Sequence, residues 1–179
     1  WRPITGWLPP LNSVEWQAVF DLYKETPEYN KVNIGMTVEE FKTIFWLEFF
    51  HRFWGRIIGV VFFVPFLFFV VKGWLKNGLV PKLVLMFILG ITQGVLGWFM
   101  VKSGLIDRPD VSQYRLTAHL GLAILIYAYM FWVALDLLLD NVKDIPRVGL
   151  GLQRLTATTV IWVFLTMLAG ALVAGLDAG

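Results

Sequence analysis

Four long apolar runs constrain this chain more than any other feature of its sequence. Three carry no charged residue: Leu83–Val101 has 19 residues, Leu116–Leu135 has 20 and Leu155–Leu176 has 22. A helix needs about 20 mostly apolar residues to cross the hydrocarbon core of a bilayer. Hydrophobic residues make up 58% of the chain and charged residues 16%, against about 45–50% and about 25% in soluble domains. The sequence therefore predicts an all-α, polytopic membrane helical bundle with four transmembrane helices.

The fourth run is short and carries charge at its beginning. Ile57–Val71 is uncharged for only 15 residues, about 22 Å of helix, which does not span a bilayer. To cross, this helix must extend back through Phe45. It then carries four polar side chains into the outer part of the membrane: Glu48, His51, Arg52 and Arg56.

Local signals fix where this long helix starts. Thr37 and Glu40 fit a capping box directly before the apolar residues, which predicts a helix over about 38–71. Pro65 within it predicts a kink, or a missing backbone bond that neighbours satisfy.

A short amphipathic helix is predicted in the segment before it, residues 1–43. Four apolar residues recur there at helical spacing, and Ser13 is the expected N-cap, with Pro27 ending the helix. The four are Trp16, Val19, Phe20 and Tyr23.

Composition excludes several kinds of site. The chain has no cysteine, which excludes disulfides, thiolate metal sites and covalent c-type haem. Its net charge of +2 is too small and scattered to indicate a nucleic-acid partner. Imidazole chemistry is limited to two residues, His51 and His119.

These two histidines are expected at similar depth near one membrane face. One helix separates the helices that carry them, so both run in the same direction. His51 lies 21 positions before Lys72 and His119 lies 17 before Asp136, a difference of about 6 Å along a helix axis. Two imidazoles on facing helices suit the axial ligation of a haem iron. Alternatively, each histidine hydrogen-bonds a neighbouring helix.

Arginines accompany both histidines. Arg115 lies one turn before His119 on the same face, and Arg52 and Arg56 follow His51. Guanidinium groups pair well with the propionate carboxylates of a haem.

Glycines accompany them as well. Gly55 and Gly59 leave a flat strip beside His51 that a porphyrin could approach. Close helix packing is the alternative reason for glycines in membrane helices, including those of the intervening helix. That helix carries Gly90, Gly94 and Gly97, and Gln93, which is expected to hydrogen-bond a neighbouring helix.

Glu48 is the candidate catalytic residue. It precedes His51 by three positions, so both lie on one helix face. Di-iron bundles need two Glu-x-x-His motifs and two further glutamates, so that kind of site is rejected. A partly desolvated carboxylate beside a haem could accept or relay protons. A salt bridge to Arg52 or Arg56 is the alternative.

Four segments together resemble the haem A synthase family. They are Glu40–Arg56 (EFKTIFWLEFFHRFWGR), Gln93–Leu105 (QGVLGWFMVKSGL), Val111–Leu120 (VSQYRLTAHL) and Gly175–Gly179 (GLDAG). The resemblance covers nearly the whole chain, from the end of the family's first helix to the end of its fifth.

This resemblance implies eight transmembrane helices in two pseudo-symmetric halves, of which this chain holds four helices. It implies oxidation of a methyl group of haem O to a formyl group, giving haem A for terminal oxidases. His51 and His119 then face the iron of the substrate haem, Glu48 is the essential carboxylate, and a resident haem b belongs to the C-terminal half. Because the outer loop lacks cysteine, the resemblance is to the proteobacterial and mitochondrial branch.

It also implies an organisation and a location. Residues 1–43 form an outer-side loop, 44–139 the helices of the substrate-haem site, 140–154 an inner-side linker, and 155–179 the first helix of the C-terminal half. The membrane is the bacterial plasma membrane or the mitochondrial inner membrane. Expected partners are the lipid bilayer, haem O, haem O synthase and oxidase-assembly proteins, with self-association left open. The alternative function is a b-type electron-transfer subunit with the same two histidine ligands.

Overall fold

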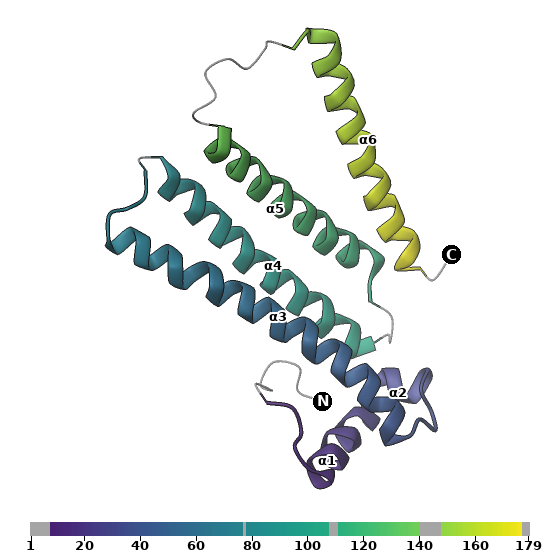
Figure 1. Cartoon of the computed structure of the whole chain (residues 1–179). Helices are drawn as coiled ribbons and strands as arrows, with labels where there is room; N and C mark the ends of the chain where they lie inside the picture. The colour runs from purple at the N-terminus through teal and green to yellow at the C-terminus, as the bar shows by residue number, and fades with distance from the viewer. Residues whose placement is uncertain (1–7, 77, 108–110, 140–147, 177–179) are drawn as a thin grey trace. The chain divides into compact units, whose positions relative to one another are not determined.

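The computed structural model describes residues 8–76, 78–107, 111–139 and 148–176, and these residues form helices and connections without a strand. The described residues divide into two compact units, one within the ranges 1–74 and 101–110 and the other within the ranges 75–100 and 111–179. The helices, labelled in Figure 1, are α1 (Ser13–Lys24), α2 (Pro27–Lys31), α3 (Val38–Val71), α4 (Leu79–Asp107), α5 (Gln113–Leu139) and α6 (Leu150–Ala174).

The four predicted membrane helices are confirmed. The helices α3 to α6 are long and apolar enough to cross a membrane, and almost none of their most apolar stretches is buried within the chain. Apolar faces of this kind suit contact with lipid. The molecule is therefore an integral membrane protein.

The helix α4 is longer than its apolar run. The run ends at Val101, and α4 continues to Asp107. No proline interrupts this stretch before Pro109, and the helix needs no apolar residues to continue outside the hydrocarbon core.

The predicted start of α3 is also confirmed. Thr37 is its N-cap, the Thr37 amide donates to the Glu40 carboxylate at 2.8 Å, and the Glu40 amide donates to the Thr37 hydroxyl at 3.4 Å. The 34 residues of α3 span about 51 Å. Since the hydrocarbon core is about 30 Å thick, the first turns of α3 lie outside it.

The ends of α1 differ from the prediction. Asn12, not Ser13, is the N-cap, because its side chain accepts a hydrogen bond from the Glu15 amide at 2.9 Å. The Glu15 carboxylate in turn accepts from the Leu11 amide at 2.8 Å. Pro27 does more than follow α1: it is the first residue of α2, a helix that was not predicted. Proline suits this position because the first helical amide has no partner within the helix.

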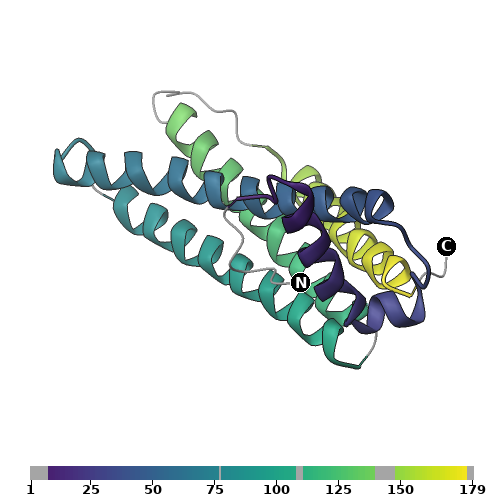
Figure 2. The ribbon, with the colours of Figure 1, turned by 90° about the horizontal axis from the view of Figure 1, so that it is seen from below.

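An aromatic cluster forms the core of the first unit. Phe41 is fully buried, and its ring centroid lies 4.8 Å from that of Tyr23 and 5.3 Å from that of Phe20. Figures 1 and 2 show α1 and α2 beside the first turns of α3, where this cluster lies. The predicted apolar stripe of α1 is confirmed, since all four of its residues belong to the cluster or pack against it. We call the five buried side chains the aromatic cluster: Phe20, Tyr23, Phe41, Phe45 and Phe49.

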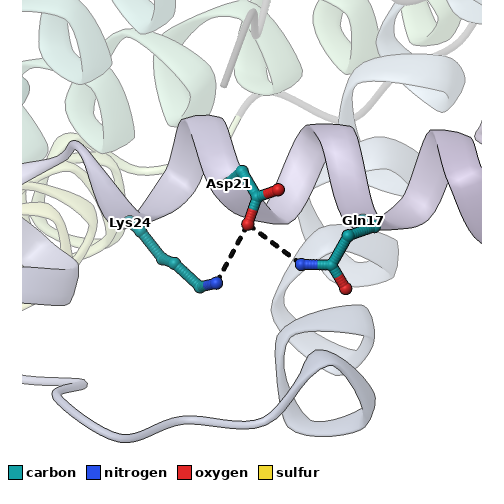
Figure 3. A network of polar contacts seen from close by, with 3 residues as sticks. All are labelled: Gln17, Asp21 and Lys24. Carbon is teal, nitrogen blue, oxygen red and sulfur yellow. Dashed lines mark hydrogen bonds and ion pairs between the residues drawn. The ribbon is translucent and has the colours of Figure 1, made fainter.

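The remaining surface of α1 carries polar side chains together with the exposed apolar side chains of Val14 and Leu22. The carboxylate of Asp21 accepts hydrogen bonds from Lys24 and Gln17, each at 2.9 Å (Figure 3). These two donors, Lys24 most of all, hold the pKa of Asp21 below its ordinary value. The helix therefore places its predicted apolar stripe toward α3 and its charged residues away from it.

Small residues join the helices of the second unit. A Cβ atom added at Gly121 of α5 would lie 3.0 Å from Leu168 of α6, and one at Gly175 would lie 2.6 Å from the backbone of Gln113. Lys82 of α4 forms an ion pair with Asp136 of α5. Close approach of backbones and polar contacts between helices are the usual means of association in a membrane.

Candidate functional site

Two of the polar residues around His51 in α3 form an ion pair. Arg52 donates to the Glu48 carboxylate one turn away, and 22% and 28% of these side chains are exposed. The alternative interpretation of Glu48 as a salt-bridge partner is therefore confirmed for Arg52. The ion pair holds the Glu48 carboxylate about one helical turn from His51, and Glu48 and His51 remain on the same face of α3.

Beside this pair lies an accessible histidine with open space along its helix. His51 is exposed within the first unit and Arg56 is half-buried. Apart from their chain neighbours and the adjacent backbone of α3, no heavy atom of the described residues lies within 4 Å of a Cβ atom added at Gly55 or Gly59. The two glycines therefore leave a bare strip of helix, and helix packing within the described chain does not account for them.

One member of the aromatic cluster, Tyr23, is influenced by the charge of Glu48. Burial raises the pKa of Tyr23 to about 12, while the Asn33 amide, which donates to its hydroxyl at 2.8 Å, partly offsets this effect. The carboxylates of Glu28 and Glu48 raise the pKa of Tyr23 further. The charge of Glu48 therefore acts on two neighbours: the buried Tyr23 hydroxyl, whose pKa it raises, and Arg52, with which it forms an ion pair.

The second histidine lies in the second unit, where α4 holds it. The side-chain amide of Gln93 donates to the His119 carbonyl at 3.0 Å and contacts its ring Nε2 at 3.4 Å. A Cβ atom added at Gly97 would lie 2.9 Å from His119 Cε1. The predicted interhelical hydrogen bond of Gln93 is thereby confirmed, and its partner is one of the two candidate ligands.

Arg115 lies one turn before His119 and contacts the same helix. Its guanidinium carbon is 4.6 Å from the centre of the Phe99 ring, a favourable cation–π distance. Half-buried Arg115 is thus positioned near His119 by α4.

The structure places the predicted site residues in two groups. Glu48, His51 and the arginines that follow it belong to the first unit, and His119 with Arg115 belongs to the second. The ligation of one iron by His51 and His119 stays a prediction. Each group suits a haem by its own chemistry: an exposed imidazole beside bare glycines, and an imidazole beside an arginine. Within the described ranges, no group of three or more histidine or acidic side chains could hold a metal ion, and axial haem ligation needs only two imidazoles.

Sequence reasoning did not specify two contacts in the group around His119. Gly97 was interpreted as a helix-packing residue without the His119 ring as its neighbour, and Phe99, which contacts Arg115, was not singled out. For Gly97 the available signal was spacing, because it lies one helical turn after Gln93, on the face that Gln93 was expected to turn toward a neighbour.

Comparison with known proteins identifies the family. Residues 1–179 match a family described as cytochrome oxidase assembly protein. The chain belongs to this family. Similar members are proteins named "Heme A synthase" from Paramagnetospirillum magneticum, 53% identical, and from Parvibaculum lavamentivorans, 54% identical. Another, from Nitrosospira multiformis, is 53% identical.

Each of these alignments covers 100% of this chain and 51% of the relative. The chain therefore spans about half the length of these members of the cytochrome oxidase assembly protein family. No solved structure matches it.

Proposed function

We propose that this chain is the substrate-haem half of a haem A synthase, an integral membrane oxidoreductase. Its reaction oxidises a methyl group of haem O to a formyl group and gives haem A for the assembly of terminal oxidases. The observation that carries this proposal is the 53–54% identity, over the whole chain, to relatives with that name. Those names do not favour the alternative of an electron-transfer subunit.

The proposed roles follow from the two groups of residues. His51 and His119 hold the iron of the substrate haem, and Arg56 and Arg115 pair with its propionates. Arg52, also predicted to contact a propionate, holds the Glu48 carboxylate through their ion pair. Glu48 accepts a proton at the methyl group or stabilises charge there. A resident haem b is assigned to the other half of the longer relatives.

The proposed setting is the bacterial plasma membrane, with the mitochondrial inner membrane as the alternative. Residues 1–43 lie on the outer side, residues 44–139 carry the site, 140–154 form the inner-side linker and 155–179 begin the second half. Haem O synthase and oxidase-assembly proteins are the proposed partners, and self-association is left open.

Replacement of Glu48 tests the catalytic assignment. In the complete protein that carries this sequence, Glu48→Ala is expected to retain haem and to lower haem A formation by at least about 100-fold, the scale of general acid–base catalysis. Glu39→Ala is the matched control, because Glu39 lies on the first turn of α3 with 80% of its side chain exposed. Full haem A formation by Glu48→Ala would remove Glu48 from the mechanism.

Extraction of bound pigments tests the activity class in the same samples. Haem O accumulating in Glu48→Ala and haem A appearing in the unmodified protein support the synthase. Haem b as the sole pigment in both would instead indicate the electron-transfer subunit. A protein without any Soret absorption would contradict both assignments.

A further inference from the structure

The contacts around His119 point to a role for α4 that goes beyond packing. The ring of His119 lies against α4 at a glycine, and one α4 side chain contacts both its backbone and its ring. We propose that Gly97 and Gln93 form a seat that sets the orientation of the His119 imidazole for ligation. Both are positioning residues, and this inference rests on the proposed role of His119 in holding haem.

Gly97 supplies the space for the ring. Its missing Cβ would lie 2.9 Å from His119 Cε1, and 3.5 Å from both ring nitrogens. Carbon atoms in van der Waals contact lie about 3.5–4.0 Å apart. Any side chain at position 97 must therefore displace an aromatic ring, which cannot fold away as a flexible chain would.

The other glycines of α4 show that this contact is specific. A Cβ atom added at Gly90 or Gly94 would have no heavy atom of the described residues within 4 Å, apart from chain neighbours and the adjacent backbone of α4. Three glycines within eight residues thus differ sharply in their surroundings. The one in contact with a neighbouring helix is the one that faces the candidate ligand.

Gln93 fixes the ring relative to its own backbone. One carboxamide contacts the carbonyl oxygen of His119 at 3.0 Å and its Nε2 at 3.4 Å. The first distance is an ordinary hydrogen bond and the second is a long one. The amide therefore stays anchored on the carbonyl when Nε2 is required by a ligand, and it limits rotation of the imidazole about its side-chain bonds.

The first experiment measures the ring without relying on haem chemistry. In the complete protein, labelled with 13C at histidine Cε1 and free of haem, the His119 resonance is assigned by its loss in His119→Gln. Gly97→Ala is expected to shift this resonance, because the added methyl group meets Cε1 directly. Gly94→Ala is the matched control and should leave it unchanged. Both changes raise intrinsic helix propensity, so a difference between them does not reflect a weaker α4. An unshifted resonance in Gly97→Ala overturns the proposal.

The second experiment asks whether the seat serves ligation. Haem content and the low-spin electron paramagnetic resonance signal of the haem at His119 are compared in the same two variants. Gly97→Ala should lower haem content about three- to tenfold or shift the principal g-values, and Gly94→Ala should do neither. A shifted histidine resonance with an unchanged haem signal would overturn the positioning role. Loss of haem A formation has no bearing on this outcome, so the proposed function and the seat fail separately.

The role of the Gln93 side chain is tested with a separate control variant. Gln93→Leu removes both contacts to His119 and is expected to broaden the low-spin signal, because the ring gains orientations. Thr92→Val is the control, since the Thr92 hydroxyl donates to the Ile88 carbonyl of its own helix at 2.9 Å. Equal broadening in both variants, or none in Gln93→Leu, would contradict the role of Gln93.

Discussion

The two units associate their helices by different means. In the first, five buried aromatic side chains join α1 to the water-side turns of α3. In the second, glycines bring α5 close to α6, and polar contacts connect α4 to α5. The difference follows from the surroundings: removal of apolar surface from water drives the first, whereas lipid offers no such gain and leaves close packing and hydrogen bonds.

The largest expected effect lies in the aromatic cluster. Phe41→Ala removes a fully buried ring and should lower the free energy of opening of the first unit by about 3–5 kcal/mol. Hydrogen exchange of the α1 amides measures this opening. Val14→Ala, at a side chain of α1 with 76% exposure, should change it by less than about 0.5 kcal/mol. Equal exchange in the two variants would show that burial does not hold this unit together.

The next effect is a loss of stability at high pH. Burial raises the pKa of Tyr23 to about 12 from the ordinary tyrosine value of 10.0, so the folded state favours the neutral phenol. This contribution is complete below pH 10 and is lost as the pH rises toward 12, amounting to roughly 2–3 kcal/mol. Tyrosinate absorbance of the unmodified protein minus that of Tyr23→Phe gives the titration. A difference curve centred on the ordinary tyrosine value would contradict the burial of this hydroxyl.

The smallest effect belongs to the ion pair between α4 and α5. The side chains of Lys82 and Asp136 are 39% and 52% exposed, and partly exposed pairs contribute about 0.2–1 kcal/mol. A double-mutant cycle of Lys82→Ala and Asp136→Ala, followed by thermal unfolding in detergent, should give a coupling energy in this range. A coupling above about 2 kcal/mol would show that charge pairing, rather than small-residue packing, dominates the second unit.

Sequence reasoning succeeded where the signals were local. The capping box at Thr37 and the end of the apolar run located α3, and the spacing of the apolar residues located the buried face of α1. It failed at α2, because five residues contain too few turns for a periodic pattern. It placed the cap of α1 at Ser13 because serine and asparagine are nearly equal as N-caps, and the contacts of Glu15 decide between them.

The site was predictable in its residue types but not in its contacts. The separation of four residues between Glu48 and Arg52 allowed their ion pair to be anticipated, although Arg56 was an equal candidate. The contact of Gly97 with the His119 ring depends on how two distant helices approach each other. No pattern within either helix specifies that distance.

The unbroken helix α3 has a consequence for how this protein tolerates insertions. Phe45, inside the aromatic cluster, and His51 are joined by fewer than two helical turns with no flexible residue between them. Each residue added there would turn everything beyond it by about 100°. A single extra amino acid would thus leave the hydropathy and length of α3 nearly unchanged but would place the His51 imidazole on a different face of the helix. The spacing between Phe45 and His51 is therefore as much a part of the site as the histidine itself.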